Sequence, residues 1–343
     1  MDKQTFCSSY PEAYFLECDA RSIEDYLLQQ QYLLSGETIS HVEKAGDGNM
    51  NCTLRVKSDK RSFIVKQSRP WVEKYPSIAA PIERTLMEAE FYSNVQRNDL
   101  VLRDMPRLLH VDENSYIVVF EDLGNAKDFT FLYNGEFITG DQLQQLTIFL
   151  GNLHTTKTTT MITNEAMRAL NYQHIYEIPL KDKSVDLDNI TPGLNDVASE
   201  FRNKNDYKKC IATLGKLYLE NGTTLLHGDY YPGSWLLTDD GVKIIDVEFC
   251  FCGPAEFDMG VMIAHLLLAK QPRSFVFKIF AHYRRMNTFD VRLAFQFAGV
   301  EIMRRLLGVA QLPIKYHLQD KRKLLELSYR LVVTPDNTLS EVD

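Results

Sequence analysis

The sequence lacks the features of secreted and membrane-spanning proteins. It contains no apolar run of the ~18 residues needed to cross a bilayer. Its first residues, MDKQTFCSSY, have neither the basic start nor the apolar stretch of a signal peptide. Its six cysteines form no C-x-x-C pair, and Cys250 and Cys252 alternate in FCFC, a spacing that suits a strand or loop better than a zinc site. We therefore expect a cytoplasmic protein with reduced thiols and no membrane partner.

Basic residues are also scarce. The 38 Lys and Arg are outnumbered by 46 Asp and Glu, which gives a net charge of −8. This balance argues against a nucleic-acid partner, because phosphate backbones bind clustered Lys and Arg. No internal repeat or low-complexity linker is present. The 343 residues are enough for about two domains, each with its own core.

The hydrophobic pattern changes near Gly124. Before it, residues 38–67 and 106–123 are rich in Val, Ile, Thr and Phe and predict short strands, with a helix beginning at Pro81 between them. After it, the polar stretch 176–205 predicts a loop or irregular insertion. Helical periodicity elsewhere in this half predicts helices over 139–156, 256–270, 274–286, 290–308 and 319–331.

One β-rich stretch interrupts the second half. Residues 224–249 predict a loop and two short strands joined by a turn at Asp240-Gly241. This order of elements predicts an α+β, protein-kinase-like, two-lobed fold. Its N-terminal lobe, residues 1–122, holds a small β-sheet with one helix after an N-terminal helical extension. Its larger C-terminal lobe, residues 123–343, is mostly helical.

A glycine-bearing turn and a strand end in the first lobe suit nucleotide binding. The turn can lay its N–H groups over phosphates, although it also suits a plain hairpin. Its candidate residues are Gly46, Asp47, Gly48 and Asn49. The apolar strand that leads into Glu121 and Leu123 can present backbone groups to an adenine edge, and an ordinary strand end fits it equally well.

Lys66 closes the apolar strand FIVK. A lysine there can reach nucleotide phosphates while it pairs with a carboxylate of the next helix; the alternative is a solvated lysine at a strand end. Glu88 is the favoured partner because it shares a helical stripe with apolar residues. Glu83 and Glu90 compete with it.

The strongest chemical signal is a pair of motifs in the second half. An HGD loop carries Asp229, and Asp246 and Glu248 end the apolar strand 242–245. Phosphoryl transfer needs one carboxylate to orient and deprotonate the attacking hydroxyl, and others to hold Mg²⁺ against the nucleotide. Because side chains at i and i+2 of a strand share one side, we expect Asp246 and Glu248 to converge on one metal ion.

Two further features have open roles. Asp258, at the start of a predicted helix, either caps that helix or braces the catalytic loop. Arg304 and Arg305 lie on an otherwise apolar helix. Since adjacent helical residues point about 100° apart, we expect one arginine to face the site and the other to face solvent.

At these residues the sequence resembles the aminoglycoside phosphotransferase and choline kinase superfamily, and within it the 5-methylthioribose kinases. The resemblance covers about residues 40–310. It is carried by GDGNMN, by FIVKQ, by HGD--GS followed by D-EF--GP--FD-G, and by AGVEIMRRLLGVA. The paired arginines, the D-x-E acids, and Ser234 in place of an asparagine are typical of the methylthioribose kinases.

The resemblance implies ATP and Mg²⁺ as cofactors. It implies a catalytic base at Asp229, metal binding at Asp246, Glu248 and Ser234, a phosphate-binding lysine at Lys66 paired with Glu88, and a sugar-site pair at Arg304 and Arg305. Tyr230 and Tyr231 replace residues of the family's HGDLHTGS loop, where the acceptor is expected. Val247 replaces the proline of DPEF.

Together these patterns predict an ATP- and Mg²⁺-dependent kinase that transfers the γ-phosphoryl group to a hydroxyl of a small molecule, best matched by a sugar such as 5-methylthioribose. An aminoglycoside or choline-like acceptor is the alternative within this reaction class. A nucleotide-binding pseudoenzyme is the alternative outside it. The sequence also allows a homodimer.

Overall fold

The chain divides into two units. The structure is a computed structural model that describes residues 2–46, 48, 50–181, 185–284 and 289–336. The first unit comprises residues 1–125 together with Asp246–Phe249, and the second comprises residues 126–245 and 250–343. We predicted that the first lobe ends at residue 122 and the second begins at residue 123, and the separate roles of the two lobes stay a prediction. The short segment Asp246–Phe249 lies in the predicted second lobe but packs with the first unit.

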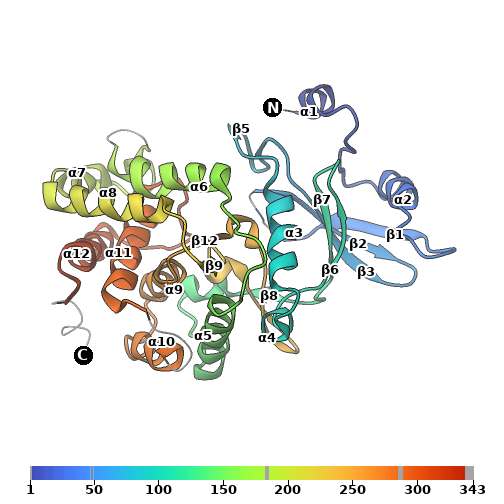
Figure 1. Ribbon diagram of the computed structural model, residues 1–343. Coiled ribbons are helices and arrows are strands. Elements are labelled where there is room, and N and C mark those ends of the chain that lie inside the picture. The colour runs from blue at the N-terminus through green and yellow to red at the C-terminus, as the bar shows by residue number, and fades with distance from the viewer. Residues whose placement is uncertain (1, 47, 49, 182–184, 285–288, 337–343) are drawn as a thin grey trace. The chain divides into compact units, whose positions relative to one another are not determined.

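An antiparallel five-stranded sheet in the order β1-β2-β3-β7-β6 forms the centre of the first unit (Figure 1). Its strands are β1 (Ile39–Lys44), β2 (Cys52–Ser58), β3 (Ser62–Gln67), β6 (Leu108–Asp112) and β7 (Ile117–Glu121). A two-stranded ribbon is formed by β4 (Trp71–Val72) and β5 (Tyr75–Ala79). The helices are α1 (Lys3–Ser9), α2 (Ala20–Gln29), α3 (Arg84–Val95) and α4 (Asp99–Leu102).

The side chains of β3 alternate between the buried core of this unit and the face that carries Lys66. Phe63 and Val65 are fully buried in a cluster that includes Ile23 and Leu27 of α2. Successive side chains of a strand point to opposite faces, so Lys66 points away from that cluster, toward α3. Strand pairing therefore fixes the direction in which the Lys66 ammonium group points.

Helix α3 begins at Arg84, three residues later than predicted from Pro81. The carbonyl of Pro81 accepts a hydrogen bond from Arg84 Nη1 (2.6 Å), and the carbonyl of Ile82 accepts one from the Ser68 hydroxyl. These side chains satisfy carbonyl groups in a turn that precedes the helix. The proline therefore opens this turn rather than the helix.

The second unit is mostly helical, as predicted. Its helices are α5 (Gly140–His154), α6 (Glu165–Tyr172), α7 (Leu194–Arg202), α8 (Asn205–Leu219), α9 (Glu256–Leu268), α10 (Ser274–Arg284), α11 (Val291–Leu307) and α12 (Leu318–Val333). Its strands are β8 (Lys127–Asp128), β9 (Thr224–Leu226), β10 (Trp235–Thr238), β11 (Gly241–Ile244) and β12 (Phe251–Gly253). The end of the helix predicted over 274–286 lies outside the described residues.

Helix α11 is the central helix of this unit, packed between α9 and α12 (Figure 1). Glycines allow both close approaches. A Cβ atom at Gly260 of α9 would lie 2.5 Å from Phe297 Cβ, and one at Gly299 would lie 2.8 Å from the Ser328 carbonyl oxygen of α12. This packing buries α11 from Phe297 to its end, including the charged residues Glu301, Arg304 and Arg305.

Two predictions for this half are wrong. The stretch 176–205 is not a loop, since it contains 3₁₀ helices and α7, whose buried residues Leu194, Val197, Ala198 and Phe201 follow helical spacing. The β10–β11 turn consists of Asp239 and Asp240, because Thr238 pairs directly with Gly241. Helices α6 and α8 were not predicted. Across the described part of the chain, no helix is long and apolar enough to cross a membrane.

The fully buried Arg84 joins several backbone segments of the first unit. Its guanidinium donates to the Asn51 side chain and to the carbonyls of Met50, Arg69, Trp71 and Pro81, at 2.6–3.2 Å. Breaking such a buried charged network typically costs about 3–5 kcal/mol.

We therefore expect Arg84→Met to lower the free energy of unfolding by about 3–5 kcal/mol, measured by urea denaturation. Arg322→Met is the control, because its ion pair with Glu200 is exposed and is expected to contribute no more than about 1 kcal/mol. Equal losses in the two variants would show that Arg84 does not have this role.

Candidate active site

The first cluster of functional side chains surrounds Lys66 in the first unit. Its Nζ atom lies 2.8 Å from Glu88 Oε2 on α3 and 2.8 Å from Asp246 Oδ1. Glu88, rather than Glu83 or Glu90, is therefore the helical partner of Lys66. The lysine and Glu88 are buried, whereas the Asp246 side chain is 48% exposed.

Burial and ion pairing act against each other in this cluster. Burial alone would lower the pKa of Lys66, but the carboxylates of Asp246, Glu88 and Glu248 outweigh it and hold that pKa above its usual range. Burial also raises the pKa of Glu88 to about 7, although Lys66 opposes this shift. The lysine therefore remains charged, while the pKa of Glu88 lies above its usual range.

Asp246 and Glu248 do not lie on a strand, so the expectation based on strand alternation is wrong. Strand β11 ends at Ile244, Asp246 has a left-handed φ of 62°, and Val247–Phe249 form a 3₁₀ helix. The turn directs the two acids to different partners. Glu248 Oε2 accepts a hydrogen bond from Asn51 Nδ2 (2.8 Å) and lies 3.4 Å from Arg84 Nε.

Asp246 has the properties of a Mg²⁺ ligand. Its carboxylate is half exposed and only its Oδ1 atom contacts Lys66. Mg²⁺ is commonly held by one or two carboxylates together with substrate phosphates. Among the described residues, no group of three or more His, Cys, Asp or Glu side chains is arranged to hold a metal ion. Glu248 as a second ligand stays a prediction.

The turn and the strand end proposed for nucleotide binding also belong to the first unit. Gly46 joins β1 to the turn with a φ of 72°, where only glycine is free of strain; Asp47 and Asn49 lie outside the described residues. Glu121 ends β7, and its N–H donates to the Arg107 carbonyl (2.9 Å). Leu123 is half-buried. Their roles toward a nucleotide stay predictions.

The second cluster lies in the second unit around Asp229. Asp258 braces this loop, because its carboxylate accepts the N–H groups of His227 (2.7 Å) and Gly228 (2.9 Å). His227 Nε2 donates to the Ile245 carbonyl (3.0 Å), and its Nδ1 accepts the Asp229 N–H (3.3 Å). Of the two roles considered for Asp258, the structure supports the brace.

Two guanidinium groups lie beside Asp229. Arg304 Nη1 and Arg305 Nη2 are 3.7 and 3.6 Å from Asp229 Oδ1. The expectation that one arginine faces solvent is wrong, because both are buried. Their long side chains bend toward Glu301, which pairs with Arg304 Nη1 at 3.1 Å and with Arg305 Nε at 2.6 Å.

Burial raises the pKa of Asp229 above its usual range, and Arg304 and Arg305 reverse only part of this shift. Asp229 Oδ1 is buried and has no hydrogen-bond partner among the described residues, because both arginines stop short of it. A carboxylate with a raised pKa and an unused acceptor atom can take a proton from a bound hydroxyl.

The two loop tyrosines differ. Tyr230 is fully buried, stacks on Phe149 and donates its hydroxyl to the Leu146 carbonyl (2.9 Å). These contacts contradict the expectation that Tyr230 contacts the acceptor. Tyr231 is only partly buried and its ring lies 4.9 Å from the Arg305 guanidinium carbon. Tyr231 therefore remains a candidate for acceptor binding.

Ser234, predicted at the metal site, ends a 3₁₀ turn in the second unit. Its hydroxyl donates to the Asp229 carbonyl (3.0 Å), which ties the turn to the loop. The prediction overlooked Glu301. Its signal was present in the sequence, since a lone acid three and four positions before two arginines on an apolar helix can pair with both.

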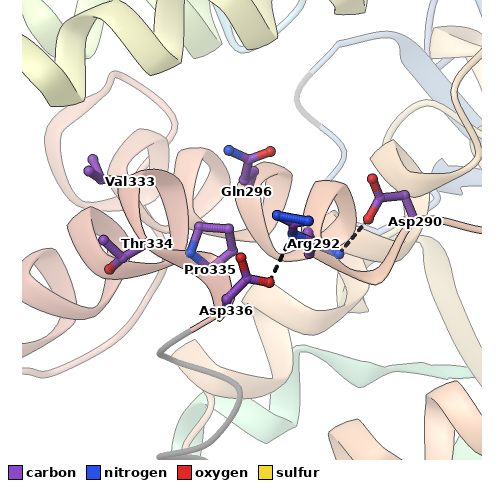
Figure 2. Close-up of a pocket in the computed structure, with 7 residues that line it drawn as sticks. All are labelled: Asp290, Arg292, Gln296, Val333, Thr334, Pro335 and Asp336. Atoms are coloured by element: carbon purple, nitrogen blue, oxygen red, sulfur yellow. Dashed lines mark hydrogen bonds and ion pairs between the residues drawn. The ribbon is translucent and has the colours of Figure 1, made fainter.

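A surface hollow of about 450 Å³ lies at the other end of α11 (Figure 2). Arg292 points into it and pairs with Asp336 (2.9 Å), while Asp290 caps the helix. Arg292 and Arg304 are 12 positions apart, or about 18 Å along the helix axis. This hollow is therefore separate from the Asp229 cluster.

Comparison with known proteins supports the predicted resemblance. The chain is 27% identical to the methylthioribose kinase of Geobacillus sp. (strain WCH70), over 82% of this chain and 81% of that protein. It is 28% identical to that of Geobacillus thermodenitrificans, over 84% and 85%. The match to the Exiguobacterium sibiricum enzyme, at 26% identity, covers 70% of this chain but only 64% of that protein.

Solved structures confirm the protein-kinase-like α+β fold class. Choline kinase LicA from Streptococcus pneumoniae superposes with a TM-score of 0.53 at 11% identity, over 91% of this chain and 98% of that one. Spectinomycin phosphotransferase APH(9)-Ia, bound to ADP and spectinomycin, gives 0.52 at 14% identity, over 93% and 99%.

The match to a family model covers residues of both clusters, but it ends before the arginine pair. Residues 41–293 fit the phosphotransferase enzyme family, a span that includes Lys66, Asp229 and Asp246. The chain therefore belongs to the phosphotransferase enzyme family.

Proposed function

We propose that this protein is an ATP- and Mg²⁺-dependent kinase that phosphorylates a hydroxyl group of a sugar such as 5-methylthioribose. The observation that carries the proposal is Asp229, a braced carboxylate with a raised pKa beside two buried guanidinium groups. The methylthioribose kinase relatives support the choice of acceptor.

At the acceptor, Asp229 orients the attacking hydroxyl and takes its proton. The buried donors of Arg304 and Arg305 then bind other oxygen atoms of the same acceptor. Rigid placement of these groups is the main source of catalysis, since holding a hydroxyl in position replaces a bimolecular encounter. The Asp258 brace serves this placement by fixing the backbone of the loop.

At the nucleotide, Lys66 binds phosphate oxygens while Glu88 holds its ammonium group in place. Gly46 and Gly48 bring backbone N–H groups to the phosphates, and Glu121 and Leu123 offer backbone groups to the adenine edge. Asp246 is the residue that would hold Mg²⁺, with Glu248 and Ser234 as candidate further ligands. The metal would neutralise phosphate charge.

The charges around Asp229 favour a neutral acceptor. Two guanidinium groups and the carboxylates of Asp229 and Glu301 balance to zero. A choline-like ammonium or a polycationic aminoglycoside would bring positive charge against the two buried arginines, a desolvated like-charge contact. A sugar hydroxyl instead accepts hydrogen bonds from them. This argument favours a sugar over both alternative acceptors.

Asp229→Asn is expected to lower kcat by about 10²–10⁴-fold, because the amide cannot take the proton. ATP affinity, measured by calorimetry, is expected to stay within about twofold. The assay is ADP release with 5-methylthioribose and a panel of sugars, choline and aminoglycosides, with product mass as the readout. Near-normal turnover would exclude Asp229 as the base, and no turnover by the wild type would favour the pseudoenzyme.

Asp246→Asn is expected to remove most of the Mg²⁺ dependence of ATP binding, because it replaces a metal-binding carboxylate with a neutral amide. Calorimetric titration with ATP at several Mg²⁺ concentrations measures this. Glu248→Gln is the comparison variant: an unchanged Mg²⁺ titration would leave Glu248 with a structural role only. A wild-type metal response in Asp246→Asn would contradict the assignment of Asp246.

Arg305→Met is expected to move the acidic limb of the kcat/KM profile to higher pH. Arg305 lowers the pKa of Asp229, so its loss raises that pKa, and the base is then protonated up to a higher pH. The profile is measured with saturating ATP and varied acceptor. Arg305→Lys, which keeps the charge, should shift the limb less. An acidic limb that does not move would show that the limb does not report the ionisation of Asp229.

A further inference from the structure

A chain of buried hydrogen-bonded side chains lies behind the arginine pair. The Tyr133 hydroxyl lies 2.5 Å from His265 Nδ1, and His265 Nε2 lies 3.0 Å from Glu301 Oε1. Glu301 in turn accepts hydrogen bonds from Arg304 and Arg305. Tyr133, His265 and Glu301 are all buried. None of the functions considered above uses Tyr133 or His265.

The chemistry of the groups fixes the direction of this chain. Burial lowers the pKa of His265 to about 4, so its ring is neutral. Burial alone would raise the pKa of Glu301, but the two arginines hold it well below its usual range. An ionised carboxylate only accepts, so His265 Nε2–H donates to Glu301 and Nδ1 accepts from the Tyr133 hydroxyl.

The hydrogen bonds to Glu301 determine which N–H groups of the two arginines stay available. Glu301 takes Arg305 Nε and Arg304 Nη1. Arg305 Nη2 and Arg304 Nε are buried without a hydrogen-bond partner among the described residues. Tyr231 packs over Arg305 (4.9 Å) and beside His265 (5.2 Å between ring centres), which limits the movement of both.

We propose that Tyr133 and His265 are positioning residues, which hold Glu301 so that both guanidinium groups present donors beside Asp229. This inference rests on the proposed kinase function, because the donors are held for the oxygen atoms of an acceptor. The role is specific to one tautomer of His265. A substitute for His265 that keeps an N–H donor at the Nε2 position is expected to preserve this role, and a substitute without that donor is expected to lose it.

The first test compares His265→Gln with His265→Asn. The glutamine amide can place an N–H near the Nε2 position, whereas the shorter asparagine amide reaches only the Nδ1 position. We expect His265→Asn to lower kcat/KM for the acceptor by about 10–100-fold, while the KM for ATP changes by less than about twofold. His265→Gln should recover most of the loss. Equal kinetics for the two variants would overturn the proposal.

The second test removes a single buried hydroxyl at each of two places. Tyr133→Phe should raise the KM for the acceptor about tenfold. Tyr207→Phe is the matched control, because the hydroxyl of Tyr207 is also buried and hydrogen-bonded, to Ser328, outside this chain. Both variants should lose similar thermal stability. An equal effect on acceptor KM would assign Tyr133 a purely structural role.

The third test needs no turnover and so separates this inference from the proposed function. Modification of Arg304 and Arg305 by phenylglyoxal, followed by peptide mass spectrometry, should be several-fold faster in Tyr133→Phe and His265→Asn than in the wild type and Tyr207→Phe. Unchanged rates would overturn the inference even if the enzyme phosphorylates a sugar. Faster rates in an enzyme without kinase activity would support the chain and contradict the function.

Discussion

The pair of arginines beside Asp229 depends on one buried carboxylate. Glu301 accepts from two adjacent arginines and from His265, and all of these side chains are buried. Without it, two guanidinium charges would lie close together in a desolvated interior. Removal of one partner from such a buried network typically costs about 3–5 kcal/mol. Glu301 therefore makes it possible for two positive charges to lie beside Asp229.

The first unit uses the same principle with different groups. Lys66 lies between Glu88 and Asp246, and Arg84 contacts Glu248. Most of these charges are buried, but Asp246 is half exposed. The exposed member is the one that can exchange its partner when a ligand arrives, whereas the buried pairs hold the scaffold. Exposure therefore distinguishes Asp246 from Glu248, although their spacing in the sequence suggests the same role.

Periodicity predicted the parts of this fold where one face is buried. The helical stripe that contains Glu88 favoured it as the partner of Lys66, although periodicity alone did not exclude Glu83 or Glu90, and the structure pairs Lys66 with Glu88. Helix α7 was missed because polar residues and Pro192-Gly193 surround it, although Leu194, Val197, Ala198 and Phe201 carry a helical stripe. The helical spacing of apolar residues was present in this stretch, but its polar composition led us to predict a loop.

The errors at the site have a different cause. The left-handed φ of Asp246 depends on the turn that packs with the first unit, so strand alternation could not describe it. The burial of Tyr230, but not of Tyr231, depends on contacts with Leu146 and Phe149 of α5, which are 84 and 81 positions earlier in the chain. Helical geometry alone led us to expect that one of Arg304 and Arg305 faces solvent, but both are buried. It could not give the bend of two long side chains toward a shared carboxylate.

The charge balance at Asp229 also bears on the proposed reaction step. Before transfer, the charges of Asp229, Glu301 and the two arginines sum to zero. When Asp229 takes the proton of the attacking hydroxyl, its charge is lost and the cluster carries one net positive charge. That charge appears as the acceptor oxygen becomes more negative and receives an anionic phosphoryl group. Preorganised charge of this kind stabilises a transition state more than a ground state. In the proposed reaction, an arginine pair held by Glu301 therefore stabilises the transition state without needing to move.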